Sequence, residues 1–430
     1  MNPSLIEIFS TICFILAVLH TFSVKKFQHI AHTAPDGSIK ENFFHLLGEI
    51  EVVFGFWAGL LLIGFMLIED THYAIEYMNS RNFTEPAFVF AIMTVAATKP
   101  VLRFANSLIF SASKLIPSKK KYNTLKYYFA ALTIGPLLGS FITEPAAMTV
   151  IALLLKEKFY DKGISQKMMY TTLALLFVNI SVGGTLTHFA APPVLMVASK
   201  WNWGLGFMMT HFGYKTVIAV FTSTAASAFL FRKELFKINL DLSNTSNQSK
   251  AIPLWITMIH LVTLGLIVGT AHYMSVFMGI FLFFLGFATV SKEFQEPLKL
   301  REALLVGFFL GGLVILGGPQ RWWLEPLLSH MDSASLFIGS AALTAITDNA
   351  ALTYLGSLVP SLEDVSKFAL VAGSVTGGGL TVIANAPNPV GYGTLNPSFG
   401  EEGISPIRLF VYALAPTLIA GLCLWFLPSL

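Results

Sequence analysis

Two short stretches of the sequence resemble each other and decide the fold. Residues 143–149 read T-E-P-A-A-M-T, and residues 347–353 read T-D-N-A-A-L-T. Each stretch places one carboxylate, Glu144 or Asp348, inside an apolar segment. A carboxylate in such a segment is costly, so it marks a functional site by default. We therefore interpret the two acids as equivalent positions of an internal repeat.

The composition around these motifs is that of a lipid-embedded protein. Of the 430 residues, 54% are hydrophobic and only 12% are charged, which argues against a soluble multidomain chain. The net charge of +3 gives no support to a nucleic-acid partner. Cys13 and Cys423 both fall in apolar segments, where packing is a better explanation than a disulfide or a metal site. We expect no cofactor and no enzymatic activity.

Apolar runs of about 20 residues predict membrane-spanning helices. The first run is interpreted as a retained span and not as a cleaved signal peptide, because no basic region precedes it. The expected fold is an all-α polytopic membrane protein with about ten transmembrane helices. They are predicted at residues 5–24, 48–68, 86–98, 164–199, 205–231, 252–271, 274–290, 303–318, 368–389 and 407–427.

Two further apolar stretches carry the opening motifs in their middle, and we expect each to fold back as a re-entrant hairpin, at residues 124–156 and 333–360. A second pair of similar motifs follows the hairpins. These motifs are G-G-T-L-T-H-F-A at 183–190 and G-G-G-L-T-V-I-A at 377–384, and prolines follow each of them. Glycines and prolines at matching points unwind a helix, which a protein-lined cavity tolerates at membrane depth. Broken helices are therefore predicted at 164–200 and 365–395. Lys99-Pro100 and Gly317-Gly318-Pro319 predict kinks.

The pattern divides the chain into a first repeat, 1–231, a polar linker, 232–251, and a second repeat, 252–430. Five crossings in each repeat is an odd number, so the second repeat must be inverted. Basic residues gather in loops on one side, and the opposite loops keep only Arg81, Lys200, Arg321 and Lys367. This asymmetry places both termini outside and the linker in the cytoplasm. The two hairpin tips would then approach each other near the midplane.

Oxygen-bearing side chains gather at both tips and both unwound loops. Carboxylate, hydroxyl and carbonyl oxygens are the ligands that a small hard cation such as sodium prefers, and burial favours the neutral form of a carboxyl group. One carboxyl group can therefore hold either a proton or a cation, which is the minimal machinery of exchange. The candidate ion and proton ligands are Thr143, Glu144, Thr149, Thr185, Thr187, Thr347, Asp348, Asn349, Thr353, Thr381, Asn385 and Asn388.

A hairpin with a small polar tip and an A-A-M or A-A-L step, followed by a broken helix opened by G-G-x-L-T and repeated in both halves, resembles a known ion-transporter superfamily. Divalent-anion/sodium symporters, arsenite permeases and several sodium/proton antiporters belong to it. Where the dicarboxylate branch has S-N-T, this chain has T-E-P and T-D-N, so its similarity is greatest to the antiporters. The resemblance implies sodium/proton exchange across a bacterial-type inner membrane. It also implies a homodimer with a fixed scaffold and a moving transport domain.

Other interpretations of the same residues stay open at this point. Glu144 and Asp348 could cap the helices that follow them, and the paired glycines could serve close helix packing. The alternative function on the same fold is a sodium- or proton-coupled symporter of a small anion, which two acids disfavour. A function from another class would be an intramembrane hydrolase with the two acids as its catalytic pair. Its sequence motifs H-E-x-x-H and G-x-G-D do not occur in the chain.

Two basic residues are candidate modulators of the site. Lys215 is a basic residue well inside a full-length span, where it could pair with Glu144 or Asp348, or instead reach toward an interface. His188 lies in the first unwound loop and could respond to pH or could be structural.

Overall fold

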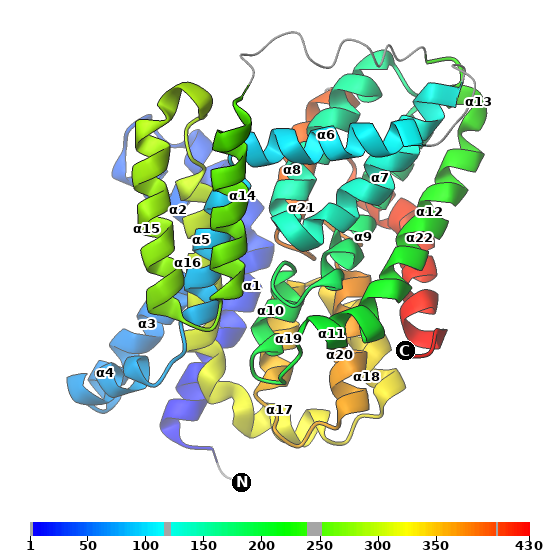
Figure 1. The fold of residues 1–430 in the computed structure, drawn as a ribbon. Coiled ribbons are helices and arrows are strands. Elements are labelled where there is room, and N and C mark those ends of the chain that lie inside the picture. Colours follow the sequence, from blue (N-terminus) through cyan, green and yellow to red (C-terminus); the bar gives the residue numbers. More distant parts are fainter. Residues whose placement is uncertain (1–2, 116–121, 239–251, 401–402) are drawn as a thin grey trace. The chain divides into compact units, whose positions relative to one another are not determined.

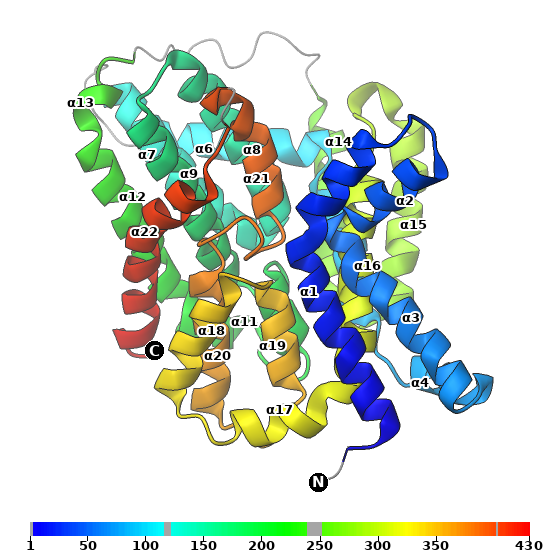
Figure 2. The same cartoon turned by 180° about the vertical axis from the view of Figure 1, so that it is seen from behind.

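The computed structural model describes residues 3–115, 122–238, 252–400 and 403–430, and these ranges contain helices and no strand (Figures 1 and 2). The all-α prediction is therefore confirmed. The chain forms two compact units, and each is assembled from non-consecutive segments. The first unit takes Met1–Ala91, Lys299–Met331 and Tyr354–Glu363, and the second takes Ile92–Leu298, Asp332–Thr353 and Asp364–Leu430. The predicted division into repeats is a different partition and stays a prediction. Its linker, 232–251, lies outside the described residues from position 239 onward.

The first unit contains a pair of closely packed helices. Gly55 and Gly312 allow the backbones to approach, since a Cβ on Gly312 would lie 2.3 Å from the nitrogen of Gly55. The rings of Phe54 and Phe309 meet edge to face beside this contact. The pair is α3 and α16, and the helices of this unit are α1 (Leu5–Thr33), α2 (Ile39–Leu47), α3 (Val53–Ile68), α4 (Thr71–Asn79), α16 (Leu300–Gly317) and α17 (Arg321–Leu328).

The second unit holds most of the remaining helices. Its first half contributes α6 (Lys99–Leu115), α7 (Asn123–Ile142), α8 (Glu144–Lys158), α9 (Gln166–Gly183), α10 (Pro192–Ala198), α11 (Leu205–Met208), α12 (Tyr214–Leu230) and α13 (Arg232–Leu235). Its second half contributes α14 (Leu254–Gly269), α15 (Met274–Val290), α18 (Ser333–Thr344), α20 (Asp364–Gly377), α21 (Asn388–Leu395) and α22 (Pro406–Phe426). Two helices, α5 (Thr84–Ala96) and α19 (Asn349–Ser357), have residues in both units.

Five helical segments in the described ranges are long and apolar enough to cross a membrane, or six if the bent α5–α6 pair is one span. Four more apolar helices, among them α3, α14 and α15, are shorter. This supports a polytopic membrane protein, while the count of ten spans stays a prediction. The turn predicted at Lys99-Pro100 is present, because α5 and α6 meet at 69°. At Gly317-Gly318-Pro319 the chain makes a single 3-10 turn between α16 and α17.

The helical breaks predicted at both motifs are present. Thr143 alone separates α7 from α8, and residues 345–348 separate α18 from α19. The predicted broken helices are interrupted between α9 and α10 and between α20 and α21. Figure 1 shows α6 lying across α7 and α8, where Ile109, Ala130 and Val150 form a common apolar cluster. Figure 2 shows α18 and α20 side by side.

A proline inside α7 explains how α9 and α12 are held beside it. Pro136 has no amide hydrogen, so the carbonyl of Leu132 one turn earlier lacks its helical donor. Asn179 of α9 and Thr224 of α12 donate to this carbonyl at 2.9 and 3.1 Å. A buried carbonyl left without a donor is costly in an apolar medium. The three helices are therefore fixed to one another by a polar contact that the proline itself makes necessary.

Candidate functional site

The Glu144 carboxylate forms the centre of the candidate site, and every residue described with it belongs to the second unit. Glu144 begins α8 and is completely buried. The side-chain amide of Asn385, from the loop between α20 and α21, donates to its Oε2 at 2.8 Å. Its second oxygen, Oε1, has no hydrogen-bond partner in the described part of the chain. The carboxylate thus has one bound and one available oxygen.

The backbone of Gly184 packs directly against this available oxygen, Oε1 of Glu144. It begins the 3-10 turn Gly184–Leu186 that interrupts the first broken helix. A Cβ at Gly184 would lie 2.3 Å from Oε1 of Glu144, far inside van der Waals contact. A side chain at position 184 would therefore displace either the carboxylate or the turn, because the unwound backbone approaches the carboxylate closely.

The second tip uses its acid differently. Asp348 lies just before α19 and accepts hydrogen bonds from the backbone amides of Ala350 (2.8 Å) and Ala351 (3.2 Å). This is the geometry of a helix N-cap, so the capping interpretation is confirmed for Asp348. Glu144 makes no such bond in the described ranges and is already the first residue of α8, so it is not an N-cap, although it lies in the first turn, where the helix dipole favours an acid. The difference arises at Thr143, whose φ of +72° starts α8 one residue earlier relative to the acid.

Asn349 connects the second tip to the loop that carries Asn385. Its backbone amide donates to the carbonyl of Ala384 at 3.1 Å. Its side chain is completely buried, and neither the oxygen nor the nitrogen of its amide has a partner in the described ranges. The structure therefore brings both tips and the second unwound loop to one place.

Asn388 and two glycines fix the second unwound loop, which lies between α20 and α21, in its place. The Asn388 amide donates to the carbonyls of Gly378 (2.7 Å) and Thr381 (2.8 Å), and its own oxygen has no partner among the described residues. A Cβ at Gly378 would meet the side chains of Ser181 and Asn349, and one at Gly379 would meet Val178. These glycines let the second unwound loop lie directly on α9.

The threonines divide into two groups. Thr143 is buried, and its hydroxyl has no partner in the described ranges. The other six each donate to a backbone carbonyl, so their hydroxyl protons are committed and only oxygen lone pairs remain. The pairs are Thr149–Pro145 (2.8 Å), Thr185–Val182 (2.7 Å), Thr187–Ser140 (2.6 Å), Thr347–Leu343 (2.8 Å), Thr353–Ala350 (3.1 Å) and Thr381–Ala345 (2.9 Å).

Ser140 is a residue of the site region that the sequence interpretation missed. Its hydroxyl donates to the carbonyl of Gly183 at 2.7 Å and accepts from the amide of Leu186 at 2.9 Å. It thereby ties the end of α7 to the first unwound turn. A signal existed, because the second motif also has a hydroxyl residue, Thr344, three positions before its first threonine, Thr347.

Neither candidate modulator contacts a tip acid. The Lys215 ammonium lies against the carbonyl of Leu424 and the ring of Phe368, so the alternative in which it pairs with Glu144 or Asp348 is not seen in this structure. His188 is partly exposed, and its ring meets that of Phe189 edge to face. Both cysteines are free in the structure. In the described ranges, no three His, Cys, Asp or Glu side chains gather as metal ligands.

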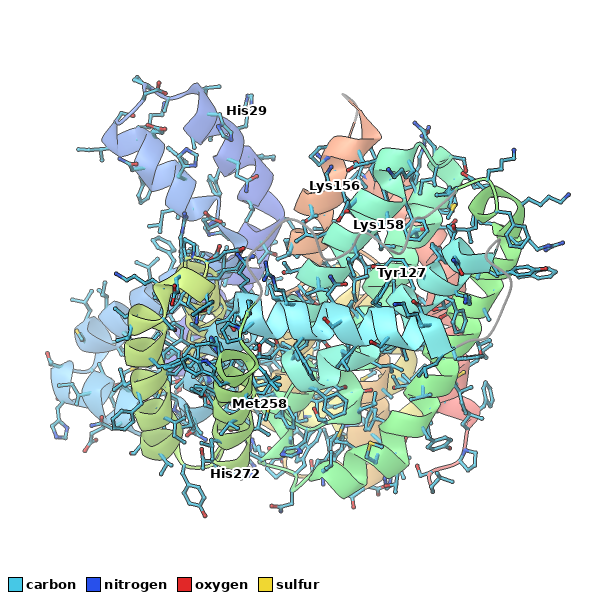
Figure 3. The ribbon with its side chains drawn as sticks, turned by 45° about the horizontal axis from the view of Figure 1, so that its top comes forward. His29, Tyr127, Lys156, Lys158, Met258 and His272 are labelled. Carbon is cyan, nitrogen blue, oxygen red and sulfur yellow. The ribbon has the colours of Figure 1, made fainter. Side chains whose placement is uncertain are left out.

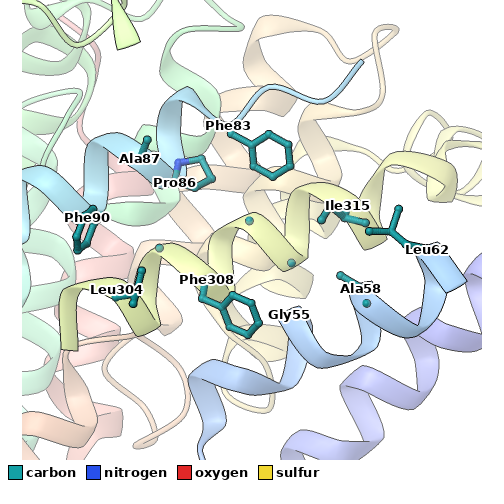
Figure 4. Close-up of a pocket in the computed structure, with 14 residues that line it drawn as sticks. Gly55, Ala58, Leu62, Phe83, Pro86, Ala87, Phe90, Leu304, Phe308 and Ile315 are labelled. Carbon is teal, nitrogen blue, oxygen red and sulfur yellow. The ribbon is translucent and has the colours of Figure 1, made fainter. Parts of the chain in front are cut away.

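The first unit contains a cavity of a different character (Figure 4). Its volume is about 480 Å³, and α3, α5 and α16 line it with residues such as Ala58, Phe90 and Leu304. These are apolar side chains and glycines, which offer no oxygen ligand to a cation. The cavity is therefore not part of the candidate ion site.

Basic residues lie at the end of α8 that is opposite Glu144. Figure 3 shows Lys156 and Lys158 at this end. Lys156 pairs with Asp161 at 3.0 Å, and Lys158 pairs with Glu157 at 2.7 Å. A rise of about 1.5 Å per residue puts Lys156 roughly 18 Å along the helix from Glu144. One helix thus joins a charged end to a buried carboxylate.

Comparisons with known proteins agree on a single class of transporter. A family model described as "Putative Na+/H+ antiporter" matches residues 5–427 of the chain. The Na(+)/H(+) antiporter NhaB of Haemophilus influenzae is 26% identical over 201 residues. That match covers 40% of this chain and 38% of the relative, so the chain spans less than half the length of the curated relative.

Proposed function

Because the chain belongs to the family described as "Putative Na+/H+ antiporter", we propose that it exchanges sodium, or another monovalent cation, for protons at a site centred on Glu144. The observation that carries this assignment is the half-satisfied Glu144 carboxylate, buried beside oxygens that have no partner. A buried carboxylate with one available oxygen can bind either a proton or a cation. The two ligands then compete for one charge.

Oxygen atoms suited to sodium surround the carboxylate in this proposal. Within the described part of the chain, the unpartnered oxygens are Oε1 of Glu144, Oγ1 of Thr143 and the amide oxygens of Asn349, Asn385 and Asn388. Hard oxygen ligands without nitrogen or sulfur suit a hard cation. The remaining threonines of the predicted set offer lone pairs at the edge of this group. Sodium displaces the proton when it brings more favourable contacts than protonation does.

We assign the two acids different roles. Glu144 carries the ion or proton, because its carboxylate is buried and only half satisfied. Asp348 holds the start of α19 and contributes its charge to the field at Glu144, since its Oδ1 is already bound to two amides. This refines the expectation that both carboxylates bind sodium directly.

The proposed membrane arrangement follows from the length of α8. Lysines mark a membrane interface, and half of a hydrocarbon core is about 15 Å thick. Lys156, roughly 18 Å from Glu144 along the helix, would then place the first tip near the midplane. The segments at 124–156 and 333–360 act as re-entrant hairpins of two inverted repeats. Both termini lie outside, the linker is cytoplasmic, and the protein works as a homodimer in a bacterial-type inner membrane.

A charge argument links binding to movement. An ionised and empty carboxylate is costly to carry through lipid, whereas a protonated or cation-loaded one is not. Only the two loaded states would therefore change access between the two faces. Exchange follows because the carrier returns only after it has bound the other ligand.

The experiment that tests the function uses the purified protein in vesicles that contain a pH-sensitive dye. Addition of sodium, lithium or potassium outside should change the lumenal pH, whereas vesicles without protein should show no response. Radiolabelled dicarboxylate, phosphate and arsenite are offered in parallel. Sodium-driven uptake of one of these anions without proton movement would contradict the proposal and support the symporter alternative.

A further inference from the structure

Lys215 is a buried charge that the proposed exchange has not used. Its side chain is only 2% exposed, and it lies in the first turn of α12, directly after the π-helical turn Met209–Gly213. None of the ion pairs in the described ranges includes it. Burial of an ionisable side chain in a membrane segment is costly, so its surroundings must stabilise it by other means.

The end of α22 supplies one of these means. Lys215 Nζ donates to the carbonyl of Leu424 at 3.4 Å. In a continuous helix this carbonyl would accept from residue 428, but that residue is Pro428, which has no amide hydrogen. The carbonyl is thus free at the negative end of the helix dipole, where a cation is favoured. The ammonium uses a carbonyl of the last turn, which the end of α22 at Phe426 leaves without a helical donor.

The ring of Phe368 in α20 supplies the other means. Lys215 Nζ lies 4.5 Å from the ring centroid, within the range of a cation–π interaction. Through one side chain, α12 is therefore fastened to both α20 and α22. A positive charge strengthens both contacts, whereas an apolar side chain would offer nothing to a free carbonyl or to the face of a ring.

The next residue connects this fastening to the candidate site. The hydroxyls of Thr216 and Thr185 are 2.8 Å apart, and Thr185 also donates to the carbonyl of Val182. Thr185 follows Gly184, whose backbone lies against Oε1 of Glu144. The hydroxyls of Thr216 and Thr185 thus connect α12 to the Gly184 turn, which lies against the Glu144 carboxylate.

We propose that Lys215 is a positioning residue for cation binding, whose fixed positive charge holds α12 so that the Thr216–Thr185 contact keeps the Gly184 turn against Glu144. The inference rests on the proposed function. It differs from a direct ion pair, because Lys215 acts through α12 and touches neither tip acid. Loss of the charge should loosen the Gly184 turn and weaken cation binding, while the carboxylate itself stays intact.

The test measures sodium dependence in two ways. In vesicles, the rate of sodium-driven proton movement is titrated with sodium, and in detergent the sodium concentration that protects the protein against thermal unfolding is determined. Lys215→Met should raise the half-saturating sodium concentration at least about threefold in both assays, as expected for residues coupled through shared contacts. The maximal rate per folded protein should change less than twofold. Lys215→Arg, which keeps the charge, and the exposed-site control Lys233→Met should match the wild type.

A second variant keeps the inference testable if Lys215→Met does not fold. Thr216→Val removes the contact with Thr185 and leaves the charge in place, and it should shift the sodium dependence in the same direction. Unchanged half-saturation in Thr216→Val, or in a folded Lys215→Met with only a lower maximal rate, would overturn the positioning role. If the wild type itself moves no protons with sodium, the proposed function fails instead.

Discussion

The side-chain amide of Asn385 donates a 2.8 Å hydrogen bond to the carboxylate of Glu144, although 241 positions separate the two residues in the chain. This bond joins the first hairpin tip to the second unwound loop. It also selects one carboxylate oxygen and leaves the other available. The bond favours the ionised form of the carboxyl group, because an amide N–H stabilises a negative oxygen.

Replacement of Asn385 by leucine should therefore shift the pH dependence of exchange. Without the donor, the protonated form of Glu144 gains relative to the ionised form, so a higher pH is needed to release the proton. A hydrogen bond to a charged group contributes about 1.5–3 kcal/mol, which corresponds to a shift of about one to two pH units toward alkaline pH. The measurement is the pH profile of sodium-driven proton movement in vesicles. A profile that stays in place, or moves toward acid pH, would contradict this role.

Gly184→Ala should abolish or severely weaken exchange. The added methyl group would lie 2.3 Å from Glu144 Oε1, so either the carboxylate or the turn must move. Displacement of a reacting group by about 1 Å commonly costs on the order of a hundredfold in rate. Gly206→Ala is the matched control, because a Cβ at Gly206 meets nothing within 4 Å. Equal exchange rates for Gly184→Ala and Gly206→Ala would show that the close contact between Gly184 and the Glu144 carboxylate is not needed for exchange.

The 3-10 turn after α16 offers a prediction about stability. Pro319 leaves the carbonyl of Ile315 without its helical donor, and the hydroxyl of Tyr77 donates to it at 2.5 Å. Tyr354 donates to the neighbouring carbonyl of Val314 at 3.2 Å. Tyr77→Phe and Tyr354→Phe should each destabilise the protein by about 1 kcal/mol, the usual cost of an unsatisfied buried carbonyl.

Thermal unfolding in detergent checks this prediction. The control is Tyr273→Phe, because Tyr273 is 66% exposed. Tyr77→Phe and Tyr354→Phe should both unfold at a lower temperature than the control. If their unfolding temperatures equal that of the control, the two hydroxyls do not stabilise the end of α16.

Several features of the fold could be predicted from the sequence because they depend on local chemistry. Proline and paired glycines interrupt a helix wherever they occur, so the breaks after Gly183 and Gly377 followed from residue type alone. The tip at Thr143 followed from an acid and a proline in an apolar run. The turn between α5 and α6 followed from Lys99-Pro100. The re-entrant course of the hairpins and the inversion of the repeats stay predictions.

The partners of the site residues could not be predicted, because they depend on tertiary structure. The two tips have the same local pattern, yet Asp348 caps its helix and Glu144 does not. The two tips differ in the backbone at Thr143, where φ is +72°. The sequence could not predict this angle, because a threonine is also present at the matching position, Thr347. The contact of Lys215 with Leu424 was likewise hidden, although Pro428 pointed to a free carbonyl near the end of α22.

The most direct test of the account compares three neutralised acids in the same vesicle assay. Glu144→Gln removes the proposed carrier, Asp348→Asn keeps a side chain that can cap α19, and Glu157→Gln removes an exposed acid at the far end of α8. Sodium-driven proton movement should be lost in Glu144→Gln, reduced but present in Asp348→Asn, and unchanged in Glu157→Gln. Wild-type exchange in folded Glu144→Gln would contradict the central claim that this carboxylate carries the ion and the proton.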